Sequence, residues 1–98
     1  MNREVADLFW GYTIDEYGNV YNSRGHQMAW KDNGSGTSHS IRLQHKGQQC
    51  VVTIGKLMYY GWKNIDLIGD SNARVYRIIR NGPYTIENLI SNYDGEEV

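Results

Sequence analysis

The side chains that could bind a metal, activate water or hold a phosphate are three histidines, one cysteine, eleven aspartates or glutamates and ten lysines or arginines. His39 and His45 share one face of a predicted strand, but six residues of strand separate them by about 20 Å at ~3.3 Å per residue. They are too far apart to share one ion, and no carboxylate is paired with either in sequence. Together with His26, they are expected to be surface or turn residues, so we predict no metal site, no cofactor and no catalytic residue.

Basic and aromatic residues are interleaved in the first two thirds of the chain, where Tyr21 and Tyr59 lie among lysines and arginines. Cationic groups beside amphipathic rings suit contacts with phosphates and stacking on bases or sugars. The alternative is that they are ordinary solvated charges and core aromatics. The candidate nucleic-acid-binding residues are Arg24, Trp30, Lys31, Arg42, Lys46 and Lys56.

A second basic set, Arg74, Arg77 and Arg80, lies near the C-terminus. On a strand predicted over residues 75–80, the side chains of Arg74 and Arg80 share the face opposite Arg77. We expect them to be exposed charges that keep an edge strand soluble.

Composition limits the class of protein. A chain of 98 residues is predicted to form one domain, residues 1–98. The net charge of −1 gives no overall attraction to DNA, so any nucleic-acid contact needs a local patch. The single cysteine, Cys50, excludes an internal disulfide and is expected to be a small buried hydrophobe. No apolar run approaches the ~20 residues of a membrane span, and no signal-peptide pattern is present, so we expect a cytoplasmic protein with no membrane partner.

The elements that would position these residues form an α+β domain. Alternating apolar residues and glycine turns predict a small antiparallel sheet that leads directly into a helix, over residues 12–62. Ile54, Leu57 and Met58 fall on one face of that helix, which is expected to begin after Thr53 and to end near Asn64.

Other elements are predicted on either side of this sheet and helix. Apolar spacing predicts a short helix over residues 2–10. A strand and a C-terminal helix with Ile86, Leu89, Ile90 and Tyr93 on one face are expected within residues 73–93. Residues 32–38 are predicted to form a loop and residues 94–98 an acidic tail. The predicted core consists of Ile14, Val20, Ile41, Leu43, Val52, Ile54, Leu57, Met58, Ile86, Leu89 and Ile90.

One spacing of aromatic, aliphatic and glycine residues runs through the predicted sheet: Tyr12-x-Ile14-x-x-x-Gly18-x-Val20-Tyr21, Gly25-x-x-Met28, Ile41-x-Leu43, Lys46-Gly47 and Val52-x-Ile54. This pattern resembles the opening module of phage HNH homing endonucleases. In that family, a stretch of the form Y-x-V-S-x-x-G-x-V begins a small sheet associated with DNA binding. The resemblance implies a DNA-binding module over residues 12–62.

The resemblance breaks where the family keeps its chemistry. Gly55 stands where the family's H-R-L-V helix has its His, and Ile78 and Ile79 stand where V-D-H-x-D-G-N has its Asp and catalytic His. The turn at Gly82 and the pair Asn88-Leu89 match the family. HNH cleavage needs a His base and metal ligands, and isoleucine supplies neither. The resemblance therefore implies a degenerate HNH segment over residues 73–93.

We expect a non-catalytic, DNA-binding phage protein in the cytoplasm of a bacterial host cell. The alternative is an inhibitor that occludes a host enzyme of defence or nucleic-acid processing, because Tyr and Trp are enriched at the cores of protein interfaces. The same composition suits a homodimer. A residual metal-dependent nuclease would require His26, His39 or His45 to converge in space.

Overall fold

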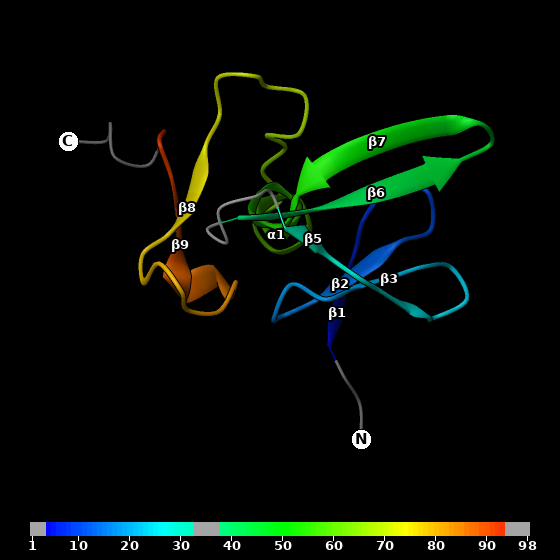
Figure 1. Cartoon of the computed structure of the whole chain (residues 1–98), viewed down its shortest axis with the longest axis horizontal. Coiled ribbons are helices and arrows are strands. Elements are labelled where there is room, and N and C mark those ends of the chain that lie inside the picture. Colours follow the sequence, from blue (N-terminus) through cyan, green and yellow to red (C-terminus); the bar gives the residue numbers. More distant parts are fainter. Residues whose placement is uncertain (1–3, 33–37, 94–98) are drawn as a thin grey trace.

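The computed structural model describes residues 4–32 and 38–93, and it has an α+β fold in which three small antiparallel sheets surround one helix (Figure 1). The fold class predicted from the sequence is confirmed. In chain order, the elements are β1 (Val5–Asp7), β2 (Thr13–Asp15), β3 (Val20–Tyr21), β4 (Gln27–Met28), β5 (Lys31–Asp32), β6 (His39–His45), β7 (Gln48–Thr53), α1 (Ile54–Lys63), β8 (Val75–Arg77), a 3-10 helix η1 (Ile86–Asn88) and β9 (Leu89–Ser91). The sheets have the strand orders β1-β2-β3-β4, β5-β6-β7 and β8-β9.

The turn between β2 and β3 is built around the buried carboxylate of Asp15. Its Oδ1 accepts hydrogen bonds from the backbone N–H groups of Tyr17 and Asn19, both at 2.9 Å. Gly18 has a φ of +90°, which a residue with a Cβ adopts only at a cost. The sequence correctly predicts a turn here.

The hairpin of β6 and β7 is the longest ladder in the described part of the chain, and its turn was also predicted. Lys46 and Gly47 have φ angles of 49° and 85°, and positive φ at both central residues defines the tight turn that suits a twisted hairpin. Ile41 and Leu43 are buried while Arg42 is exposed, as the alternation predicts.

Helix α1 lies at the centre of the molecule and contacts all three sheets (Figure 1). Ile54, Leu57 and Met58 are fully buried on its inner face. The helix follows Thr53 directly, and Asn64 ends it in the left-handed conformation, as predicted.

The predicted helix over residues 2–10 is wrong in the part that is described. Residues 5–7 form β1, which pairs with β2 through Ala6 opposite Ile14. The helical spacing of Val5, Leu8 and Phe9 is outweighed by strand pairing. The backbone N–H and C=O groups on one edge of β2 need hydrogen-bonding partners, and β1 supplies them.

The predicted C-terminal helix is also wrong. Only residues 86–88 are helical, as a 3-10 turn, and the chain then forms β9 against β8. Leu89 is buried and Ile90 is 39% exposed, because neighbouring residues of a strand point to opposite faces. Ile90 is therefore not the core residue that the helical spacing predicts. The expected strand over residues 75–80 ends at Arg77.

The rest of the predicted core is confirmed, except that Ile86 is only partly buried. Cys50 is likewise half-buried at the edge of the core. The expected loop lies mostly outside the described residues, at 33–37, and the expected acidic tail at 94–98 lies wholly outside them. Within residues 4–32 and 38–93, no helix has the length and apolar character that a membrane crossing requires.

Candidate nucleic-acid interface

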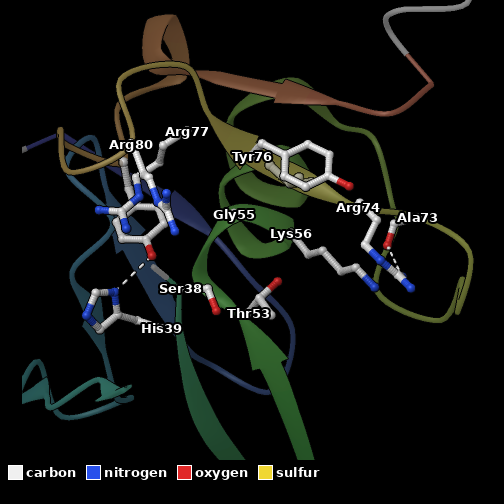
Figure 2. A pocket seen from close by; sticks show the side chains of 12 residues that line it. Ser38, His39, Thr53, Gly55, Lys56, Ala73, Arg74, Tyr76, Arg77 and Arg80 are labelled. Carbon is white, nitrogen blue, oxygen red and sulfur yellow. Dashed lines mark hydrogen bonds between the residues drawn. The ribbon is translucent and has the colours of Figure 1, made fainter. Parts of the chain in front are cut away.

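A basic pocket opens where the N-terminus of α1, the start of β6 and strand β8 meet (Figure 2). Its volume is about 600 Å³, within the range of pockets that enclose small ligands. Four cationic side chains and one imidazole line it: Lys56, Arg74, Arg77, Arg80 and His39. We refer to this cavity as the basic pocket.

The N-terminus of α1 adds to the positive potential of the pocket. The first backbone N–H groups of a helix have no partner within the helix, and the helix dipole places partial positive charge there. Thr53, the capping residue, makes no side-chain hydrogen bond to these groups, and the first turn contains no acidic residue. Helix N-termini of this kind favour anions such as phosphate.

Gly55 lets β8 approach this end of the helix. A Cβ placed on Gly55 would lie 2.7 Å from Cγ1 and 2.9 Å from Cβ of Val75, closer than side chains tolerate. The missing side chain therefore allows Val75 to pack against α1. This contact brings Arg77, the last residue of β8, and the neighbouring Arg74 up to the helix N-terminus.

Lys56 and Arg74 are held by the backbone of the loop before β8. Lys56 Nζ donates to the carbonyl of Asp70 at 3.2 Å, and Arg74 donates to the carbonyls of Ser71 at 3.0 Å and Ala73 at 3.2 Å. These acceptors are neutral, so the hydrogen bonds orient the two cations without cancelling their charge.

The Asp70 carboxylate is a nearby acidic group that opposes anion binding. The hydroxyl of Tyr93 donates to it at 2.6 Å and is the main reason why the pKa of Asp70 lies below its usual value. The N–H of Asn72 and the charge of Lys56 lower that pKa further. Asp70 is therefore ionised at neutral pH and offsets part of the charge of Lys56.

An aromatic cluster positions Arg77. The Arg77 guanidinium lies 4.6 Å from the ring centre of Tyr84 and donates to the carbonyl of Gly82 at 3.0 Å. The Tyr84 hydroxyl shares a hydrogen bond of 2.9 Å with Nδ1 of His39. Burial raises the pKa of the Tyr84 phenol, and the charge of Arg77 opposes this shift. Tyr84 therefore remains neutral and in place at physiological pH.

Asn88 shapes the loop that carries Arg80. Its Oδ1 accepts from the N–H of Ile79 at 2.8 Å, and its Nδ2 donates to the carbonyls of Ile79 and Pro83 at 3.2 and 2.8 Å. These bonds fold residues 79–83 back towards the pocket. The loop also leaves Ile78 and Ile79 exposed by 62% and 66%.

The structure does not bring the six predicted binding residues together. Of these, Lys56 alone lines the basic pocket. Lys31 and Arg42 border a separate hollow on the three-stranded sheet, and Lys46 lies at the tip of the β6–β7 hairpin. Arg24 lies in the turn between β3 and β4.

Trp30 has a structural role. Its indole N–H donates to the carbonyl of Gly18 at 3.0 Å, and its ring packs 5.2 Å from both His39 and Tyr84. It therefore supports one wall of the basic pocket and is half-buried.

The C-terminal arginines were missed as site residues, because the strand was expected to continue to Arg80. Since β8 ends at Arg77, the alternation of faces stops there, and the following turn carries Arg80 to the same pocket as Arg74 and Arg77. One sequence feature could have indicated this site: three arginines lie within seven residues of a chain whose net charge is −1.

The histidines are dispersed. His39 and His45 lie at opposite ends of β6, and His45 stacks on Trp10 with ring centres 5.5 Å apart. In the described ranges, no three His, Cys, Asp or Glu side chains form a group that could hold a metal ion.

Comparisons with protein-family models, with curated proteins and with solved structures found no match to this chain. The basic pocket itself is therefore the main basis for a functional assignment.

Proposed function

We propose that this protein binds DNA without cleaving it and that the basic pocket holds the DNA phosphates. The observation that carries the proposal is the convergence of Lys56, Arg74, Arg77 and Arg80 at the N-terminus of α1. Guanidinium groups, ammonium groups and backbone N–H groups are the donors that proteins use for phosphate oxygens. Because the whole chain has a net charge of −1, this concentration of cations is a local feature.

The resemblance of residues 12–62 to the DNA-associated module of phage HNH endonucleases gives independent support for DNA as the partner. The proposal includes no cleavage step, because Ile78 and Ile79 stand at the positions of that family's Asp and catalytic His. In the same proposal, the protein acts in the cytoplasm of a bacterial host cell.

DNA binding is tested by fluorescence anisotropy with labelled DNA at low salt. We expect saturable binding, and we expect the double variant Arg74→Glu/Arg80→Glu to weaken it by about tenfold or more, because two phosphate-binding charges are reversed. Arg24→Glu/Arg42→Glu is the matched control, since it makes the same charge change outside the pocket. We expect it to bind like the unmodified protein.

Three results would contradict parts of this proposal. No saturable binding to any DNA would exclude the function. An equal or larger loss in the Arg24 and Arg42 control would move the binding face to the sheets. Cleavage of a plasmid with magnesium or manganese would show a nuclease.

A second candidate function is supported by one observation, the adjacent exposed side chains of Ile78 and Ile79. Exposed neighbouring aliphatic residues are typical of protein contact sites, which suits an inhibitor of a host enzyme or a homodimer. Sedimentation of the purified protein tests self-association, and a binding assay with candidate host enzymes tests inhibition. Ile78→Ser/Ile79→Ser should abolish either contact, whereas Val51→Ser, an exposed control on β7, should not.

A further inference from the structure

The basic pocket contains an exposed aromatic ring that phosphate binding does not explain. Tyr76 lines the pocket and is 54% exposed. Because strand residues alternate, Val75 faces α1 while Tyr76 faces solvent. Exposed aromatic rings beside cations are the stacking platforms of proteins that bind single-stranded nucleic acids.

The cations lie on both sides of this ring. Along the chain, Arg74 precedes Tyr76, and Arg77 and Arg80 follow it. Figure 2 shows the ring of Tyr76 between the Arg77 and Arg80 side chains on one side and Lys56 and Arg74 on the other. Two cationic groups separated by an aromatic face match the order phosphate, base, phosphate in a nucleic-acid strand.

The concave shape of the pocket favours a single strand over a duplex. A duplex carries its phosphates on a stiff convex surface and keeps its bases stacked inside, so a base reaches a pocket only after it is flipped out. A single strand presents phosphates and base faces together. The cavity of about 600 Å³ is large enough for a nucleotide-sized group.

We propose that the basic pocket takes single-stranded DNA in preference to duplex DNA, with one base stacked on Tyr76 and the flanking phosphates on the two cationic groups. This inference rests on the proposed DNA binding. It adds the form of DNA that is bound and a base-contacting residue.

The test compares three ligands of equal length, about 12 nucleotides, within the range that single-strand-binding sites cover. They are a single strand, the same strand with abasic sites in place of bases, and the duplex. We expect the single strand to bind most tightly. Tyr76→Ala should weaken its binding by about 5- to 100-fold and leave binding of the abasic strand unchanged, because only stacking is lost.

Two variants serve as controls. Tyr76→Phe keeps the ring and should restore single-strand binding. Tyr17→Ala removes an equally exposed tyrosine, 56% exposed, from the turn after β2 and should have no effect.

The results separate this inference from the proposed function. Equal or tighter binding of the duplex, or unchanged single-strand binding by Tyr76→Ala, would overturn the stacking proposal and leave DNA binding intact. If Tyr76→Ala weakened binding of the abasic strand as much as binding of the normal strand, Tyr76 would support the pocket structurally, and the stacking proposal would also be overturned. Absence of binding to all three ligands would overturn both proposals.

Discussion

At the scale of single residues, Asp15 is the polar group on which the first sheet depends most. It is 1% exposed, and its carboxylate accepts from two backbone N–H groups, from the Asn19 side chain and from the buried Tyr21 hydroxyl at 3.1 Å. A buried carboxylate is tolerated only when its oxygens are satisfied in this way. Its backbone carbonyl also accepts from the indole N–H of Trp62 at 3.1 Å, which ties the turn to α1.

We predict that Asp15→Ala lowers the free energy of unfolding by about 3 kcal/mol, because it leaves several donors without an acceptor. Urea denaturation followed by tryptophan fluorescence measures the change. Asp66→Ala is the control, because Asp66 also accepts a backbone N–H, that of Ile68, but is exposed. Asp66→Ala should lower the free energy of unfolding by about 0.5 kcal/mol or less. An equal decrease in both variants would contradict the role given to Asp15.

At the scale of elements, the contact between α1 and β8 creates the basic pocket, and Gly55 is the residue that permits it. Alanine normally stabilises a helix by about 1 kcal/mol relative to glycine. Here an added methyl group would meet the branched side chain of Val75, which has little freedom to move aside. Overpacking of this kind costs about 1–3 kcal/mol, so the clash outweighs the helix preference.

We therefore predict that Gly55→Ala lowers the free energy of unfolding by about 1 kcal/mol and weakens DNA binding, because β8 is displaced. Thermal denaturation and anisotropy measure the two effects. In a Val75→Gly background the same substitution should be neutral or stabilising relative to Val75→Gly alone, since both close contacts, to Cγ1 and to Cβ of residue 75, are removed. A more stable Gly55→Ala single variant would show that the contact is looser than described.

Local sequence patterns predicted an element correctly where the alternation of side chains and the residue types of the turn indicate the same structure. Ile41 and Leu43 alternate with polar residues, and Lys46-Gly47 has the residue types of a tight hairpin turn, so the β6–β7 hairpin could be read from the sequence. The two ends of the chain could not. Val5 and Leu89 lie in segments with helical spacing, yet both segments form strands, because β2 and β8 need hydrogen-bonding neighbours and a local pattern does not report distant partners.

The candidate site was only partly predictable for the same reason. Lys56 was one of six candidate binding residues, five of them basic, whereas Arg74, Arg77 and Arg80 were expected to keep an edge strand soluble. The pocket forms between segments about twenty residues apart, through a glycine contact that has no local signal. The arginine spacing was visible, but its interpretation depended on where β8 ends.

At the scale of the whole molecule, charge is unevenly distributed. A net charge of −1 gives no overall attraction to DNA, so the proposed binding would depend on the few contacts of the basic pocket. Each phosphate neutralised on a single strand contributes about −0.7 to the slope of log affinity against log salt.

We predict a slope of about −1.4 for single-stranded DNA, corresponding to roughly two phosphate contacts, those of the phosphates that flank the stacked base. Arg80→Ala should reduce its magnitude by about 0.7, because one contact is lost, while Arg24→Ala should leave it unchanged. Titrations between about 50 and 200 mM salt measure both values. A steeper slope that responds equally to both variants would indicate diffuse binding over the surface.

The small size of the β8–β9 sheet has a consequence for how a ligand would act. Its ladder has three residue pairs, and a two-stranded ladder of this length is not stable alone in water. It persists because it is docked on α1, so the pocket exists only while this sheet is docked. A molecule held between the helix and the sheet would therefore act as a clamp, and its binding energy would be shared with the folding of the last third of the chain.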